Sequence, residues 1–517
     1  MKIVCVSLIL ALMSASSIAW SSTYYIDYAS GSDSNNGASK YAPWKHHPYM
    51  KGFTGSYDHQ GGDIFVFKGG VSWPYSASDP MYPWKIKVGG SSGNPDQYTV
   101  DKNWFDGSTW TSPVFDGCQT ASGSNVCGLN GASTLGPQNF LMGDNHNVVS
   151  NIVINGLQLQ NIGYPVSGSQ QGSGETMLFE GGGGSITIAN CVLIPQGLEA
   201  FDIDINNGQT SSQIYVHDNQ ISYAGRGVIF GFTGSNVSDV EVYNNKWEGP
   251  GPELTTILTN DGYHLDGLMI GDANERGPNE QPTINNVLFY GNDFYGQWDN
   301  QTSMFFSDGG INNISVYNNV FSIEQTSPGP YTGNMPAFVF IGRYGSYGNL
   351  NFYNNTFSSD SEVGTYGVGD GIFFNGSQAA WPTYINIKNN IFSGVNTGIE
   401  LGSGTTWTSL SSNNNLYNLD GGSMITLDGG WNYTSTSSAC SGGGYDCNSL
   451  GSNNYSSAYP GFISLSNGAD GSENLDVRSG SPAIGAGANL SGIFTTDITG
   501  AKRPSTGGWT IGAYEGR

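Results

Sequence analysis

Acidic side chains recur along the chain at spacings that could bring several carboxylates together. The candidates for chemistry are Glu175, Glu180, Glu199, Asp202, Asp204 and Asp266. Two carboxyl groups, one protonated and one ionised, can break a glycosidic bond. The same oxygen atoms are the ligands that Ca²⁺ prefers in proteins. The residue types predict acid–base chemistry, with Glu199, Asp202 and Asp266 as catalytic candidates, or a cation site formed by Glu175, Glu180 and Asp204.

A second concentration of polar side chains lies in the segment 260–272, NDGYHLDGLMIGD. It places His264 two residues before Asp266, and a His beside an Asp is the simplest pair for moving protons near neutral pH. Because long loops on a rigid scaffold often carry function, we expect His264 to be catalytic and Tyr263 to contact substrate. A His-x-Asp sequence is also common in structural turns, and that interpretation stays open.

An internal repeat reveals the elements that must position these residues. From about residue 185 one phrase recurs as ITIANCVL (186–193), IYVHDNQI (214–221), VEVYNNKW (240–247), VLFYGNDF (287–294), ISVYNNVF (314–321), LNFYNNTF (350–357), INIKNNIF (385–392) and SLSSNNNL (409–416). Each phrase is a short alternating strand, an Asn-rich bend and a further apolar residue. Helical repeats keep a fixed length and a 3.6-residue period, and this pattern has neither.

The bend position is Asn in every unit from the second, ending at Asn414, and it is Cys191 in the first unit. Asn tolerates the left-handed backbone region, and its amide can hydrogen bond to identical neighbours above and below. Stacked units therefore predict a ladder of Asn side chains. Cys191 then occupies the first rung as a small buried residue rather than a reactive thiol.

A second strand phrase follows each bend, as in EAFDIDIN (199–206), RGVIFGFT (226–233) and DGIFFNGS (370–377). Two strand phrases per repeat, each stacked on its counterparts, define a parallel solenoid. Alternation predicts an outward-facing column made of Leu178, Asp202, Ile229, Met269, Phe305, Phe340, Phe373 and Glu400. A slip of one residue would turn a side chain to the other face.

Stacking would also gather the candidate residues on one face. Rungs are about 4.8 Å apart, so acidic residues one or two rungs apart come within reach of each other. The apolar members of the column, Met269, Phe305, Phe340 and Phe373, would form a platform on which sugar rings stack. Long turns that simply cover these side chains are the alternative.

With these repeats the chain resembles the pectate-lyase-like superfamily, which contains polysaccharide lyases and glycoside hydrolases. The resemblance covers nearly all of the chain after its first residues. The segment 23–46 with GGDIFVFKGG (61–70) is similar to the N-terminal cap of these proteins, and SPAIGAGA (481–488) with IGAYEGR (511–517) is similar to their ending. The resemblance implies an all-β fold, a single-stranded right-handed parallel β-helix with an N-terminal cap and extended turn loops. It implies architecture more strongly than chemistry.

The resemblance also implies a polysaccharide substrate. Lyases of this superfamily use Lys or Arg as the base, with Ca²⁺ assisting, and Arg226 is the one basic residue among the acidic columns. Alternatively, Arg226 balances the charge of Glu199 or Asp266. A hydrolase needs only two carboxylates, which are plentiful here, so hydrolysis is slightly favoured over lyase chemistry. A non-catalytic, glycan-binding surface solenoid is the third interpretation.

Composition and the N-terminus point to an exported protein. The net charge of −24 makes nucleic acid and anionic membranes poor partners. Lys2, an apolar run over 3–13 and small residues up to Ala19 predict a signal peptide over 1–19, and hence secretion to the extracellular space or the periplasm. No later stretch is apolar for long enough to insert into a membrane. A monomer is the default expectation.

The cysteines and the repeat divide the rest of the chain. Cys118 with Cys127, and Cys440 with Cys447, each close a short loop, and disulfides suit an exported protein. Chance proximity is the alternative for both pairs. The expected organisation is an N-terminal cap with the first coils over 20–150, a β-helix core over 151–420, and C-terminal coils with a cap over 421–517.

Overall fold

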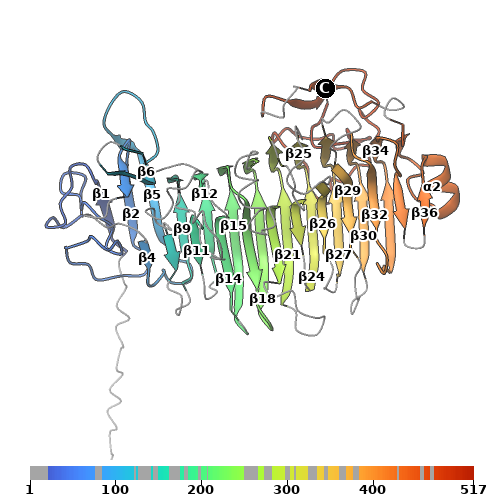
Figure 1. Ribbon diagram of the computed structural model, residues 1–517. Coiled ribbons are helices and arrows are strands. Elements are labelled where there is room, and N and C mark those ends of the chain that lie inside the picture. Colours follow the sequence, from blue (N-terminus) through green and yellow to red (C-terminus); the bar gives the residue numbers. More distant parts are fainter. Residues whose placement is uncertain are drawn as a thin grey trace, which may run out of the picture.

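The chain forms one long stack of short strands, seen in a computed structural model (Figure 1). It describes residues 21–516 apart from 76–83, 122–123, 126–140, 144–148, 162–174, 180–183, 196–198, 207, 250–265, 273–281, 297, 299–302, 308–309, 324–334, 343–346, 360–367, 376–382, 428–429, 455–458 and 466–470. The predicted signal peptide over 1–19 lies outside these residues. No helix in the described part of the chain is long and apolar enough to cross a membrane.

The first of three parallel sheets, sheet A, carries the strand of the Asn-rich phrase. Its strands pair in chain order, each coil lying on the one before it. They are β1 (Thr23–Ile26), β2 (Ile64–Gly69), β5 (Asp96–Phe105), β9 (Ile152–Asn155), β12 (Ile186–Ala189), β15 (Thr210–His217), β18 (Asn236–Tyr243), β21 (Thr283–Tyr290), β24 (Gly310–Tyr317), β27 (Asn349–Tyr353), β30 (Tyr384–Lys388) and β33 (Ser409–Asn413).

Sheet B follows the Asn-rich bend, and its strands again pair in chain order. They are β3 (Ser72–Tyr75), β6 (Val114–Ala121), β10 (Gln158–Gln160), β13 (Val192–Ile194), β16 (Gln220–Ser222), β19 (Lys246–Glu248), β22 (Asp293–Tyr295), β25 (Val320–Ile323), β28 (Thr356–Ser359), β31 (Ile391–Ser393), β34 (Leu416–Asn418) and β37 (Leu450–Ser452), with β7 (Ser124–Asn125) pairing to β6.

Sheet C carries the second strand phrase and completes each coil. Its strands are β4 (Trp84–Ile86), β8 (Leu141–Gly143), β11 (Met177–Phe179), β14 (Glu199–Ile205), β17 (Arg226–Gly231), β20 (Asp266–Asp272), β23 (Ser303–Ser307), β26 (Met335–Ile341), β29 (Val368–Phe374), β32 (Thr397–Leu401), β35 (Ile425–Leu427) and the antiparallel β36 (Trp431–Tyr433). Three sheets in which successive coils from β2 onward stack strand on strand make the chain a parallel β-helix, and the predicted fold is confirmed.

The interior is filled by columns of apolar side chains that repeat from coil to coil. The longest aromatic column runs along sheet B, with neighbouring ring centroids 5.1–5.3 Å apart, through Trp247, Phe294, Phe321, Phe357, Phe392 and Tyr417. This spacing is close to the distance between paired strands, so each ring stacks on the ring of the next coil. The stack holds successive coils in register.

The predicted Asn ladder is present at the corner between sheets A and B. Its amides hydrogen bond from rung to rung at 2.9–3.2 Å, through Asn219, Asn245, Asn292, Asn319, Asn355, Asn390 and Asn415. Cys191 takes the first rung, where its backbone N–H donates to Asn219 Oδ1, and its thiol is buried and free. The interpretation of Cys191 is confirmed.

The last rung was predicted one residue too early. Asn414 lies in the left-handed region with φ of 55°, and its side chain leaves the ladder to bond Ala486 O, while Asn415 carries the rung. The same division holds at Asn244 and Asn245, where only the first has a positive φ. The bend therefore needs two residues, one that adopts the left-handed backbone and one whose amide joins the ladder.

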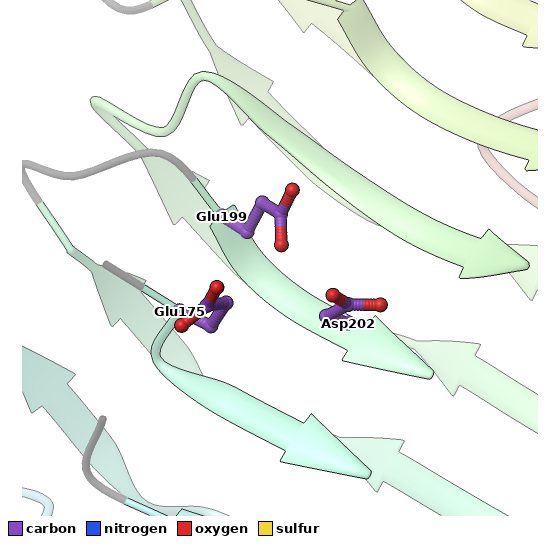
Figure 2. A group of neighbouring side chains, drawn as sticks. All are labelled: Glu175, Glu199 and Asp202. Carbon is purple, nitrogen blue, oxygen red and sulfur yellow. The ribbon is translucent and has the colours of Figure 1, made fainter. Parts of the chain in front are cut away.

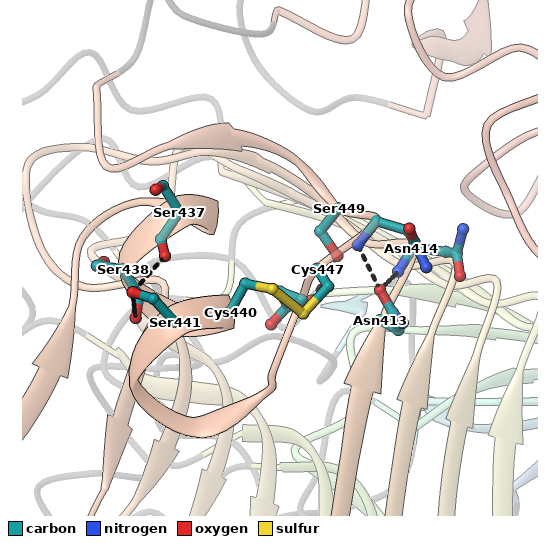
Figure 3. Close-up of a disulfide and its surroundings, with 10 residues drawn as sticks. Asn413, Asn414, Ser437, Ser438, Cys440, Ser441, Cys447 and Ser449 are labelled. Atoms are coloured by element: carbon teal, nitrogen blue, oxygen red, sulfur yellow. Dashed lines mark hydrogen bonds between the residues drawn. A yellow bond between two sulfur atoms is a disulfide. The ribbon is translucent and has the colours of Figure 1, made fainter.

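The C-terminal end of the ladder is closed by a short helix and a disulfide (Figure 3). Helix α2 (Thr436–Gly443) contains Cys440, which is bonded to Cys447 as predicted. The bridge lies beside Asp446, which is fully buried and accepts hydrogen bonds from Asn415, Ser412, Ser449 and Tyr417. The side chains of the other predicted pair, Cys118 and Cys127, lie outside the described residues.

The chain then folds back over the solenoid. Strands β38 (Phe462–Ser464) and β39 (Asn474–Val477) form a small antiparallel pair. The C-terminal residues lie along the sheet B side, above β25 in Figure 1. Arg503 is 5 % exposed and donates hydrogen bonds to Asn318 Oδ1 and to Glu515, which fixes this segment to the coils.

Candidate functional site

The predicted outward column exists on sheet C, with two members corrected. Strand pairing puts Leu178, Asp202, Val228, Met269, Phe306, Phe340, Phe373 and Glu400 in one file. Ile229 and Phe305, which were expected there, are both fully buried in the core. Phe305 packs against the core ring of Phe289 with centroids 4.8 Å apart, so it cannot contact substrate as predicted.

The error has a physical cause. Most strands of sheet C place two consecutive residues inward between their outward positions, for example Ala200 and Phe201 in β14. Strand β17 has only one inward residue, Gly227, between its outward residues Arg226 and Val228. Gly227 faces Phe201 and Trp247. Simple alternation does not anticipate either arrangement.

Three predicted carboxylates converge where β11 and β14 begin. Glu175, Glu199 and Asp202 each place an oxygen within 4.8 Å of the others. Figure 2 shows the side chains of two successive coils turned toward one another. Glu175 pairs with Glu199 across the two coils, and the irregular step after Glu199 brings Asp202 to the same side of the sheet. Glu175 and Glu199 are 6 % and 3 % exposed, while Asp202 is half-buried. We call these three residues the acid triad.

Arg226 lies on the next coil and is engaged with the acid triad. Its Nη2 is 2.7 Å and its Nε 2.8 Å from Glu199 Oε1, and its Nη1 is 3.6 Å from Met269 Sδ. Burial lowers the pKa of the Arg226 guanidinium, but the carboxylates of Glu199 and Asp266 outweigh burial and the pKa is raised overall. Arg226 therefore stays charged and balances Glu199, as the alternative interpretation of the sequence expected.

Asp202 holds its proton far more tightly than an ordinary aspartic acid. Burial is the largest cause that raises the pKa of Asp202 well above its usual range, and the charges of Glu199 and Asp204 raise it further. The Asp202 and Glu199 carboxyls each place an oxygen within 4.8 Å of the other. Because like charges this close cannot both be ionised without cost, the protonated form of Asp202 is favoured.

Two oxygens of the acid triad have no donor facing them. Within the described residues, neither Glu199 Oε2 nor Asp202 Oδ1 receives a hydrogen bond, although both atoms are buried. A buried carboxylate oxygen needs a proton, a donor or a cation beside it. Carboxylate oxygens are also the ligand type that a hard cation such as Ca²⁺ prefers, so the acid triad fits a cation in ligand type.

The remaining predicted site residues do not belong to the acid triad. Asp266 is fully buried, and its Oδ1 accepts hydrogen bonds from the backbone N–H and the hydroxyl of Ser303 at 3.0 and 3.2 Å, so it joins β20 to β23. Asp204 lies on β14 beyond Asp202, half-buried, and its charge acts on Asp202. The predicted residues His264, Tyr263 and Glu180 lie outside the described part of the chain.

An aromatic platform lies farther along the same column. Phe306 stacks on Phe340 with centroids 5.3 Å apart, and Phe340 meets Phe373 edge to face at 5.1 Å. Phe340 is 9 % exposed and Phe373 is half-buried, so the platform is partly accessible. Phe306 takes the place that was predicted for Phe305.

A second acidic pair, which we did not predict as a site, ends the column. Burial, followed by the charge of Glu400, raises the pKa of Asp370 to about 8 despite a hydrogen bond with Thr397. Burial also raises the pKa of Glu400. Glu400 was placed in the outward column from the sequence, whereas Asp370 begins the neighbouring strand phrase 370–377, so the two were not predicted as a pair.

Comparison with known proteins gives only distant likenesses. No protein-family model matches the chain, and a search of curated proteins found no match to its sequence. Among solved structures, pectate lyase Pel9A is 13 % identical with a TM-score of 0.41, covering 96 % of this chain and 98 % of that one. The GH136 lacto-N-biosidase from Eubacterium ramulus is 10 % identical (TM-score 0.38; 78 % and 68 % covered), and a rhamnogalacturonan lyase is 14 % identical (TM-score 0.37; 86 % and 91 % covered). At these identities and TM-scores the likenesses say nothing about the chemistry of this chain.

Proposed function

We propose that the protein is an exported enzyme that hydrolyses glycosidic bonds of a polysaccharide at the acid triad. The observation that carries this proposal is the convergence of three carboxyl groups within 4.8 Å, one of which, Asp202, has a strongly raised pKa. A carboxyl group that holds its proton tightly, next to a second carboxylate, offers the protonated and ionised pair that glycoside hydrolysis needs.

The geometry favours a double-displacement route. Retaining glycosidases hold their two carboxyls about 5–5.5 Å apart, whereas inverting enzymes leave room for a water at larger separations. In the proposed reaction Asp202 donates its proton to the leaving oxygen while Glu175 attacks the anomeric carbon and forms a glycosyl ester. Asp202, now a carboxylate, then takes a proton from the water that cleaves the ester. Glu199, held by Arg226, supplies the negative charge that keeps the proton on Asp202.

The aromatic platform would hold the neighbouring part of the sugar chain. Asp202 and Phe306 are three rungs apart in one column, a distance of roughly 14 Å at about 4.8 Å per rung. A polysaccharide that lies along the stack could therefore place one bond at the acid triad and later rings over Phe340 and Phe373. Met269, which lies between Asp202 and Phe306 in this column, would line the path.

A cation-assisted lyase is the second candidate, and the oxygens without donors favour it. Glu175, Glu199 and Asp202 would hold the cation, which would supply the positive charge that an acidic sugar needs on this face. Arg226 would have to act as the base, yet two of its nitrogens are engaged with Glu199. That engagement is why hydrolysis is favoured.

The test is turnover of a panel of neutral and acidic polysaccharides, with and without EDTA. New reducing ends without an unsaturated product are expected, insensitive to EDTA, and Asp202→Asn should remove them. Glu241→Gln, which makes the same kind of change on sheet A, should keep full activity. EDTA-sensitive formation of unsaturated ends would support the lyase instead. Binding without any product would leave a non-catalytic glycan-binding solenoid.

A further inference from the structure

A second recess lies away from sheet C, where the C-terminal segment overhangs the corner between sheets A and B. It is a groove of about 620 Å³, a volume typical of small-molecule sites. Its walls come from the coils of β18, β21 and β24 on one side and from residues 494–500 with Tyr514 on the other. None of its lining residues belongs to the acid triad or to the aromatic platform.

The overhanging wall is held in place by the left-handed Asn residues of the bend. Side chains of this row donate to backbone carbonyls of the C-terminal segment at 2.7–3.0 Å, through Asn318, Asn354, Asn389 and Asn414. Asn318 also accepts a hydrogen bond from the buried Arg503. The groove is therefore built against a fixed wall rather than a loose tail.

The row continues beyond this segment without such a cover. At the equivalent positions of preceding coils, Gly291, Asn244 and Asp218 line the groove. Asn244 Nδ2 donates to Asp218 Oδ1 at 3.3 Å, and Asp218 Oδ2 is 2.7 Å from His217 Nδ1. The downstream half of one polar row thus binds the protein's own chain, while its upstream half faces the groove. A polar ligand could use the upstream half in the same way.

Three polar side chains of the lining are left for a ligand. In the described part of the chain, no hydrogen bond is made by the carboxylate of Asp293, the ammonium group of Lys246 or the hydroxyl of Tyr514, and all three line the groove. Asp293 is half-buried, and burial, aided by the charge of Glu473 and opposed by Lys246, raises its pKa to about 6. Asp293 and Tyr514 are half-buried, and polar groups partly withdrawn from water gain from a partner, whereas Lys246 is exposed at the rim.

The apolar part of the lining is aromatic. Tyr290, Tyr317 and Phe494 form a continuous stack with centroids 4.9 and 4.7 Å apart, and all three rings border the groove. Acceptors from Asp218 and Asp293, a donor from Lys246 and ring edges suit the hydroxyls and C–H surface of a sugar. The three carboxylates of the lining, Asp218, Asp293 and Asp497, outnumber the one ammonium group, which disfavours an anionic ligand.

We propose that this groove is a second carbohydrate site, separate from the acid triad, that binds a neutral sugar of a polysaccharide chain. Asp293 and Tyr514 hold the sugar hydroxyls, and Lys246 donates from the rim. The role proposed for the site is to anchor a chain on the protein, while cleavage takes place at the acid triad.

The test is a calorimetric titration with neutral hexasaccharides of glucose, xylose, mannose and galactose, with trigalacturonate as the acidic probe. It is carried out in the Asp202→Asn background, where no turnover interferes. At least one neutral hexasaccharide should bind saturably, and Asp293→Asn should weaken it about tenfold, as expected for the loss of a charged acceptor. Tyr514→Phe and Lys246→Gln should each weaken binding less.

Phe340→Ala is the matched control, because it removes a ring of the sheet C platform and should leave this binding unchanged. Absence of saturable binding to every neutral probe would overturn the proposal, and so would binding that Phe340→Ala abolishes and Asp293→Asn leaves intact. Failure of turnover alone, with groove binding retained, would count against the acid triad and not against this site.

Discussion

The Asn ladder and the acid triad are built from the same coils and the same rung spacing, yet they satisfy opposite rules. In the ladder every amide is both donor and acceptor, so Asn292 bonds the rung on either side and a backbone carbonyl as well. In the acid triad each ionised side chain can only accept, and two buried oxygens lack a donor. Stacking places like side chains next to each other in successive coils. Stacked amides hydrogen bond and stabilise the solenoid, whereas stacked carboxylates repel unless a proton, an arginine or a cation lies beside them.

The largest effect should come from breaking the ladder. Asn292→Ala would leave the backbone N–H of Asn245 without its acceptor, and would remove the amide donor to Asn319 Oδ1 and Val242 O, in a buried column. At about 1–3 kcal/mol for each unsatisfied group, we expect a loss of about 4 kcal/mol in the free energy of unfolding. Chemical denaturation followed by circular dichroism measures it. Asn285→Ala, at a partly exposed position of the same coil whose backbone is not left-handed, should change little. Equal losses in the two variants would contradict the comparison.

Removing the arginine should come next. Arg226→Gln leaves Glu199 without its countercharge beside Asp202, and breaking a buried pair from one side costs about 3 kcal/mol. Arg226→Lys keeps the charge but loses the two-pronged contact, so it should recover part of the stability. If Arg226→Gln unfolds at the wild-type denaturant concentration, the ion pair does not compensate the acid triad.

The disulfide tests how firmly the ladder is closed. Cys440→Ser with Cys447→Ser opens a loop of sequence separation 7, and a loop this short contributes about 2 kcal/mol. Because Asp446 lies next to this bridge and accepts from Asn415, amide exchange should rise at the last rung before it rises at Asn292. Uniform exchange along the ladder would show that the bridge does not hold its end.

The smallest effect concerns pH. Asp370 has a usual pKa of 3.8 that the fold raises to about 8, so between these values the folded state keeps a proton that the unfolded state has lost. Stability therefore falls as pH rises through this window. Asp370→Asn should be more stable than the wild type by about 1 kcal/mol at the upper end, allowing for its partial exposure, and equal to it at the lower end. Thermal melts of both proteins across this pH window measure the effect. If the stability of Asp370→Asn falls with pH as steeply as that of the wild type, the prediction is wrong.

The repeat made the architecture predictable, because period-two strands and an Asn bend recur with the same internal spacing. The acid triad was also within reach of the sequence, since Glu175, Glu199 and Asp202 fall on adjacent rungs. What alternation could not supply was the number of inward residues at each corner. That number determines that Val228 rather than Ile229, and Phe306 rather than Phe305, stands in the outward column. It depends on local backbone geometry that residue type alone does not encode.

The ladder shows the same limit at smaller scale. Asn413, Asn414 and Asn415 are identical in type, and only the left-handed backbone at Asn414 decides which amide joins the rung. The pairing of Asp370 with Glu400 was hidden for a related reason, because both lie on consecutive coils but on different outward columns.

The most direct test of the acid triad is the anomeric configuration of the first sugar released, followed by NMR during hydrolysis of a polysaccharide that the protein cleaves. Carboxyls as close as Asp202 and Glu175 predict a product with the configuration of the bond that was broken. A product of inverted configuration, or an unsaturated one, would contradict that role for the acid triad.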